Sequence, residues 1–192
     1  MSRRVHGLGI ALVAILLLAA ATLLDGWLPN DAADPVAEPF LRTAKVGEAV
    51  PMRTLTLEVD SVTGASTVEE YGAEIRSPGI WVVVQYSVTA MDENGAIGYV
   101  DVRDDDGRVW VGSHGRARNV CLSAPPGVRN GCVAVLEVPA DALPSLRLRL
   151  SPTIEQRFDD VAEVDLGLTA DDADRFRTIT GLEIPSVTLG GS

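Results

Sequence analysis

Apolar and polar residues alternate with a period of two along much of this chain. The clearest run spans 80–90, where the even-numbered positions are apolar or aromatic and the odd-numbered positions become polar from Gln85 onward. Successive side chains of a strand lie on opposite faces, so this pattern predicts a β-strand with one buried face. Four further runs show the same alternation and predict strands over 55–62, 131–139, 146–150 and 162–168.

Two acidic stretches end in residue pairs that favour tight turns. Residues 92–95 read Asp-Glu-Asn-Gly, and residues 104–107 read Asp-Asp-Asp-Gly. Asn-Gly and Asp-Gly tolerate the positive φ angles of two-residue hairpin turns. We therefore predict a turn at each, the second joining a strand at 99–103 to one at 108–113. About seven or eight short strands at regular spacing, with little helical periodicity, predict an all-β antiparallel β-sandwich.

Three regions depart from this alternation. Residues 63–78 contain two glycines and a proline and predict a long loop. Residues 169–177 predict a helical turn, because Thr169 can act as N-cap with Asp172 three positions later. The C-terminal residues predict either a loose tail or an added edge strand, formed by Leu182, Ile184, Val187 and Leu189.

An uncharged apolar run, 8–24, lies near the N-terminus and is preceded by Arg3 and Arg4. Its length is at the short end of what spans the hydrocarbon core of a bilayer. Basic residues beside a span stay in the cytoplasm, and acidic residues follow this run. We therefore predict one transmembrane helix, a signal-anchor, with a cytoplasmic N-terminus and the remaining chain outside the cytoplasm.

A cleaved signal peptide is the alternative interpretation of the same run. Ala19 and Ala21 are small residues suited to a cleavage site, and cleavage would yield a secreted protein. We favour the anchor because the run stays uncharged through 22–24, which a removed signal peptide does not need. A buried helix of a soluble protein is a third interpretation.

These signals divide the chain into four parts. Residues 1–28 are expected to form the cytoplasmic stub and transmembrane helix, and the proline-containing residues 29–44 an extended linker. Residues 45–169 are expected to form the β-sandwich, followed by a C-terminal tail over 170–192.

The net charge narrows the choice of partners. The 14 basic and 27 acidic residues that follow residue 24 give that part of the chain a net charge of −13. Such a surface repels nucleic acid and anionic lipid headgroups, so we expect no nucleic-acid partner. A solvated acidic surface is the plain interpretation, and attraction of a cationic ligand is the functional one.

The two cysteines, Cys121 and Cys132, both fall in the part expected outside the cytoplasm. Disulfides persist in that environment, so we predict that these residues form one. Two free thiols or half of a metal site are the alternatives, although the spacing does not match a zinc pair.

Three candidate sites can be weighed from the residues. Asp104, Asp105 and Asp106 resemble the acidic start of a calcium loop, but the remaining pattern is missing, which leaves a solvated turn or a weak cation site. A second acidic cluster falls within 159–174 and admits the same two interpretations. His114, the one histidine after the apolar run, is expected to be a surface residue rather than a catalytic base. We predict no cofactor and no metal centre.

Two tryptophans are candidates for partner contact. Alternation places Trp81 on the face of its strand opposite Tyr86, and Trp110 lies in the strand that follows the second acidic turn. Packing in the core is the structural interpretation, and an exposed aromatic patch for a partner is the functional one.

Three short motifs carry a resemblance to a known family. They are Lys-Val-Gly-Glu at 45–48, the Asp-Gly turn within 102–110 and Glu-Val-Pro at 137–139. With the strands around them, they resemble the immunoglobulin-like (telokin-like) extracytoplasmic domains of unknown function in actinobacterial and other Gram-positive membrane-anchored proteins and lipoproteins. The resemblance covers about 45–152. It implies an extracytoplasmic immunoglobulin-like β-sandwich and supplies no catalytic residues, and this chain lacks the lipoprotein cysteine.

These observations favour a non-enzymatic domain on the outer side of the membrane. We expect it to bind or scaffold a cell-envelope partner, either a protein or a glycan. An accessory or sensor subunit of a transporter or signalling system is the alternative, and an envelope hydrolase using His114 is the less favoured one.

Overall fold

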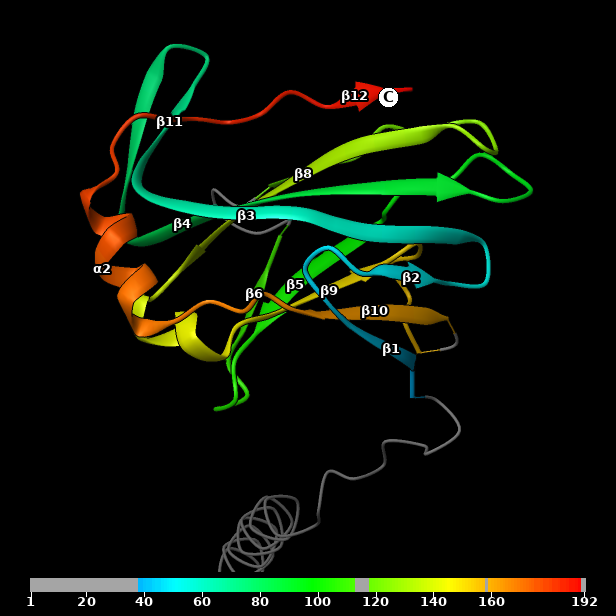
Figure 1. The fold of residues 1–192 in the computed structure, drawn as a ribbon, viewed down its shortest axis with the longest axis horizontal. Coiled ribbons are helices and arrows are strands. Elements are labelled where there is room, and N and C mark those ends of the chain that lie inside the picture. The colour runs from blue at the N-terminus through cyan, green and yellow to red at the C-terminus, as the bar shows by residue number, and fades with distance from the viewer. Residues whose placement is uncertain (1–37, 113–117, 158, 191–192) are drawn as a thin grey trace, which may run out of the picture. The chain divides into compact units, whose positions relative to one another are not determined.

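Two β-sheets pack face to face in the computed structural model, which describes residues 38–112, 118–157 and 159–190 (Figure 1). One sheet has five strands and the other has seven. The predicted β-sandwich is therefore confirmed, but the described residues form twelve strands instead of seven or eight, and two of the strand pairs, 40–45 with 160–165 and 182–183 with 68–69, are parallel. Within the described residues, no helix is long and apolar enough to cross a membrane. The predicted span at 8–24, its cleavage alternative and His114 all lie outside the described residues.

The larger sheet is built around three long strands. β3 (Leu55–Glu70) and β4 (Ala73–Ala90) form a hairpin, and β8 (Arg129–Val138) pairs antiparallel with the other side of β4. Short strands extend both edges: β2 (Ala49–Pro51) and β11 (Leu182–Glu183) on β3, and β7 (Arg118–Val120) and β12 (Thr188–Leu189) on β8.

The loop predicted for 63–78 is wrong, because β3 and β4 continue to pair up to Glu70 and Ala73. The glycine that suggested a loop has a packing role instead. A Cβ atom on Gly64 would lie 2.5 Å from the Phe176 ring, so the strand carries a glycine where a helix approaches it closely. Register shifts in the hairpin, as in a β-bulge, allow both strands to bend without ending.

The smaller sheet has the order β1 (Phe40–Lys45), β10 (Asp160–Asp165), β9 (Arg147–Ser151), β5 (Tyr99–Arg103) and β6 (Val109–Val111). β1 pairs parallel with β10, and the other pairs are antiparallel. β1 begins inside the range expected to be linker, so the sandwich starts earlier in the chain than predicted. The β5–β6 hairpin at 104–107 is confirmed.

The core between the sheets contains the residues that the alternation predicted. Ile80, Val82, Val84, Tyr86 and Val88 of β4 are all buried there, at 0–1% exposure. Strands of the smaller sheet meet them with apolar side chains, among them Leu148, Leu150, Ala162 and Val164.

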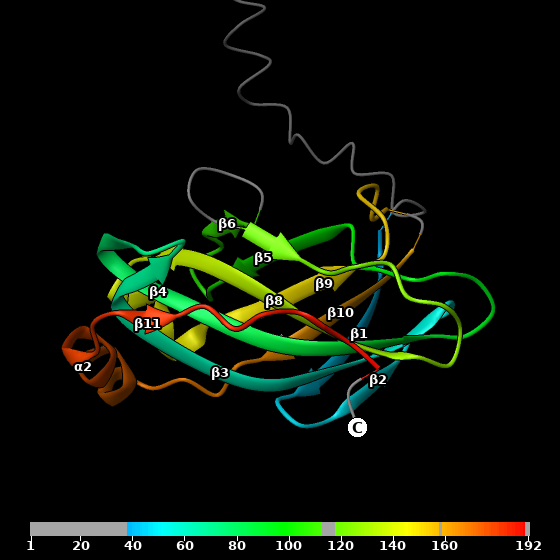
Figure 2. The same cartoon turned by 90° about the horizontal axis from the view of Figure 1, so that it is seen from above.

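A second apolar cluster lies on the opposite face of the larger sheet. Trp81 and Val83 of β4 pack there with Val133 and Val135 of β8 and with Val68. The C-terminal segment crosses this face between β11 and β12 (Figure 2) and packs Leu182, Ile184 and Val187 on the cluster. The segment thus covers a face that would otherwise be exposed.

The helix α2 (Ala170–Thr178) precedes that segment. Its predicted N-cap is confirmed: the Thr169 side chain accepts a hydrogen bond from the backbone N–H of Asp172, and the Asp172 carboxylate accepts one from the backbone of Thr169. Phe176 is 1% exposed and anchors the helix against β3. A 3₁₀-helix, η2 (Ala140–Ser145), joins β8 to β9.

Candidate functional site

The connection between β4 and β5 differs from the predicted hairpin turn. β4 belongs to the larger sheet and β5 to the smaller one, so residues 91–98 cross from one sheet to the other. Local turn chemistry at 92–95 is compatible with either outcome, because it does not specify which strand pairs next.

Backbone hydrogen bonds hold this crossing at both ends. The N–H of Met91 donates to the carbonyl of Thr54 at 3.0 Å, and the N–H of Gly98 donates to the carbonyl of Ser151 at 3.0 Å. In the middle, Gly95 and Ala124 exchange two hydrogen bonds of 3.0 and 3.1 Å. These contacts tie the crossing to neighbours on several sides.

Gly95 is required by close packing at this point. A Cβ atom there would lie 2.7 Å from the Cβ of Ala90, which is closer than side-chain carbons approach one another. Ile97, two residues later, is 5% exposed and joins the core between the sheets. The crossing is therefore anchored in the core.

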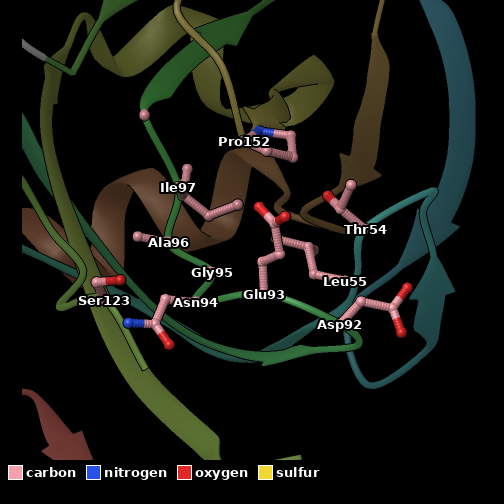
Figure 3. Close-up of a pocket in the computed structure, with 11 residues that line it drawn as sticks. Thr54, Leu55, Asp92, Glu93, Asn94, Gly95, Ala96, Ile97, Ser123 and Pro152 are labelled. Atoms are coloured by element: carbon pink, nitrogen blue, oxygen red, sulfur yellow. The ribbon is translucent and has the colours of Figure 1, made fainter. Parts of the chain in front are cut away.

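A pocket of about 580 Å³ opens beside this crossing (Figure 3). Leu55, Ile97 and Pro152 supply its apolar lining, and the side chains of Thr54 and Ser123 add hydroxyl groups. Ligand pockets combine this kind of apolar surface with a few polar groups. The pocket is the strongest candidate for a binding site in the described part of the chain.

Acidic side chains stand at the pocket. In Figure 3 the carboxylate of Glu93 points into the space between Ile97, Thr54 and Pro152, whereas the carboxylate of Asp92 lies to one side. Both residues are exposed, and neither forms an ion pair with any residue that the structure describes.

The predicted disulfide is present and supports the pocket wall. Cys121 and Cys132 are joined, and the chain between them carries Ser123, which lines the pocket, and Ala124, which pairs with Gly95. The disulfide joins the end of β7 to the adjacent strand β8, so it does not bridge the two sheets.

The weak cation site predicted at Asp104, Asp105 and Asp106 is not formed. Arg108 contacts Asp104 at 2.5 Å and Asp106 at 3.6 Å, and Arg147 contacts Asp105 at 2.6 Å. Among the described residues, no group of three or more His, Cys, Asp or Glu side chains could hold a metal ion. The guanidinium groups of Arg108 and Arg147 already neutralise the three carboxylates that a metal cation would bind.

The Asp104 carboxylate shows the strength of this pairing. Burial raises its pKa, but hydrogen bonds from the backbone and guanidinium of Arg108, together with its charge, outweigh burial and lower the pKa below its ordinary value. Its side chain is 1% exposed. The group is a structural part of the β5–β6 turn.

The second acidic cluster is also occupied by internal partners. Asp159 and Asp160 contact Arg53 and Arg42 at 2.5 and 3.3 Å, and Asp172 caps α2. These contacts separate the carboxylates into structural pairs.

The two tryptophans do not form one exposed patch. Trp81 is 1% exposed beneath the C-terminal segment, and its Nε1–H donates to the carbonyl of Ile75 at 3.0 Å. Trp110 lies on the other sheet, half-buried against the core, with the guanidinium of Arg108 5.5 Å from its ring centre. Trp81 therefore follows the structural interpretation, packing within the fold, and the two tryptophans do not form the exposed patch of the functional interpretation.

Asp92 and Glu93 were recognised from the sequence only as turn residues. The acidic turn at 104–107 is followed at once by Arg108, whereas the turn at 92–95 is followed by apolar residues. The absence of an arginine directly after residues 92–95 is the signal that could have identified this turn as the one whose carboxylates have no neighbouring cation.

Comparisons with known proteins add limited information. No known protein family matches the chain, and no curated protein matches it. An uncharacterized β-sandwich protein from Clostridium difficile 630 is 10% identical, covers 66% of this chain and 95% of its own, and has a TM-score of 0.44. The yjhA protein of Bacillus subtilis is 16% identical, with 63% and 99% covered and a TM-score of 0.44.

Proposed function

We propose that this chain is a non-enzymatic, membrane-anchored binding module with an immunoglobulin-like domain outside the cytoplasm. Its partner belongs to the cell envelope and binds at the pocket beside the β4–β5 crossing. The apolar run at 8–24 supports the anchor, and the sequence resemblance over 45–152 supports the immunoglobulin-like assignment.

The pocket carries this proposal. It combines the apolar side chains of Pro152 and Ile97 with a carboxylate, Glu93, that forms no ion pair with any described residue. A solvated carboxylate facing an apolar wall contributes nothing to packing, but it can orient a ligand. The hydrogen bonds and the disulfide around the crossing hold the pocket in one shape, so little order has to be gained on binding.

Site-specific photocrosslinking in intact cells tests the proposal. A photoreactive residue replaces Asn94, which lines the pocket and is exposed, or Glu74, an exposed control at the β3–β4 hairpin. We expect a discrete adduct with an envelope component from position 94 and none from position 74. Ala96→Trp fills the pocket and should abolish the adduct, whereas Ala96→Ser should preserve it.

Two results would overturn this function. One is an adduct that forms equally at both positions or persists in Ala96→Trp. The other is protection of the domain from protease added to spheroplasts, since a domain outside the membrane is open to digestion. Circular dichroism of Ala96→Trp checks that the sandwich remains folded.

A further inference from the structure

We propose that the pocket binds a basic side chain of a partner protein, that is, an ammonium or guanidinium group at the end of an aliphatic stem. This inference rests on the proposed function, because it names the ligand of the same pocket. The site consists of Glu93 at its centre, Asp92 beside it, and the apolar side chains of Pro152 and Ile97, with Leu55 buried behind them.

The charges at the pocket are complementary to a cation. Asp92 and Glu93 are adjacent like charges, and the lining residues include no lysine or arginine in the part of the chain that the structure describes. By contrast, the carboxylates of Asp104 and Glu163 are paired, with Arg108 and with Arg149 at 2.7 Å. The pocket thus keeps a negative charge that an incoming ammonium or guanidinium group can neutralise by charge-assisted hydrogen bonds.

The apolar lining determines what must carry that cation. Lysine and arginine have aliphatic stems that pack along apolar surface while the charged end stays at a polar edge. Ile97 and Pro152 flank the space into which Glu93 points, and the Thr54 hydroxyl lies on the same side (Figure 3). A stem can contact Ile97 and Pro152 while its charged end reaches the carboxylate. A small inorganic cation would leave this apolar surface unused.

The net charge of the chain also favours a cationic ligand. The net charge of −13 after residue 24 attracts cationic groups over a distance and repels polyanions. A basic segment of a protein meets this condition, whereas an acidic glycan does not. The partner that fits is therefore a protein presenting an exposed lysine or arginine.

Titration with blocked amino acids tests the ligand class directly. The full-length chain in detergent is titrated with the Nα-acetyl methylamides of lysine, arginine, norleucine and glutamate, while the methyl signals of Leu55 and Ile97 are followed by NMR. The lysine and arginine probes should shift both signals, and added salt should weaken their binding. Norleucine has a similar stem without charge and should bind at least severalfold more weakly.

Matched variants locate the interaction. Glu93→Gln should raise the Kd of the lysine probe roughly threefold to tenfold, with a smaller increase for Asp92→Asn. Glu183→Gln removes an exposed charge on β11, outside this pocket, and should leave the Kd within about twofold.

The possible outcomes separate this inference from the proposed function. Equal binding of norleucine or glutamate, or an unchanged Kd in Glu93→Gln, overturns the basic ligand and leaves the pocket as a binding site. No shift with any probe, while the pocket-dependent photoadduct persists, also overturns the basic ligand alone. Failure of both the probes and the photoadduct overturns the pocket as the site.

Discussion

The two acidic turns of this domain have similar sequences and opposite roles. Residues 104–107 close a hairpin within one sheet, and each of their carboxylates has an arginine partner. Residues 92–95 lie on a crossing between the two sheets, and their carboxylates have no ion partner in the described structure. One turn uses its charges to hold the fold, and the other leaves them available beside a pocket.

Local turn chemistry is therefore a poor guide to which acidic residues serve function. The Asp-Gly and Asn-Gly pairs both permit a reversal of the chain, but only long-range packing decides what the flanking charges face. Arg108 directly follows the turn at 104–107 and neutralises the Asp104 carboxylate. The turn at 92–95 leads directly to Ile97. Because Ile97 is buried in the core, Asp92 and Glu93 lie beside apolar side chains.

Among the variants proposed for comparing the two turns, loss of the disulfide should have the largest effect on stability. The double variant Cys121→Ser/Cys132→Ser should lower the free energy of unfolding by about 3 kcal/mol, because the bridge closes a short loop in the unfolded chain. The same loop carries Ser123 and Ala124, so the lysine probe should also bind more weakly. Urea unfolding followed by tryptophan fluorescence measures the first effect, and the NMR titration measures the second.

The unmodified chain treated with a reducing agent is the matched control. It should show the same fall in stability as the double variant. The Asp104–Arg108 pair lies in the other sheet and should be unaffected. Unchanged probe binding after reduction would show that the disulfide does not position the pocket.

A smaller effect is expected from Ile97→Val, which removes one buried methyl group at the pocket. The free energy of unfolding should fall by about 1 kcal/mol, in line with other buried Ile→Val changes. Ile154 is 79% exposed, so Ile154→Val should change stability by less than about 0.5 kcal/mol. Equal effects in the two variants would mean that the crossing is not anchored in the core.

The sequence predicted the parts of the fold that depend on short-range pattern. Alternation over 80–90 identified the central strand, and Thr169 with Asp172 identified the helix cap. The loop prediction for 63–78 was wrong because Gly64 accommodates Phe176, a contact between residues more than a hundred positions apart. The segment that covers Trp81 and the pocket itself could not be predicted for the same reason, since the C-terminal segment and Ile97 reach these positions only in the folded chain.

The pH dependence of stability should distinguish the two turns. The depressed pKa of Asp104 means that its carboxylate stabilises the folded state when ionised, above its ordinary pKa, and loses this contribution as the pH falls through the folded pKa. Asp104→Asn should therefore lower the thermal midpoint at pH 7, and the deficit should shrink below about pH 4. Thermal unfolding monitored by circular dichroism from pH 3 to 8 measures this. A deficit independent of pH would assign the effect to altered packing of the turn.

The smallest effect is expected at the other turn. The double variant Asp92→Asn/Glu93→Gln removes two exposed charges that have no ion partner in the described structure, so stability should change by less than about 0.5 kcal/mol. The change should be slightly favourable, because two adjacent like charges no longer repel each other. Urea unfolding at pH 7 measures this, with Asp104→Asn analysed in parallel. A fall in the free energy of unfolding of more than about 1 kcal/mol would show that these carboxylates also stabilise the fold. They would then not be available at the pocket to neutralise a ligand.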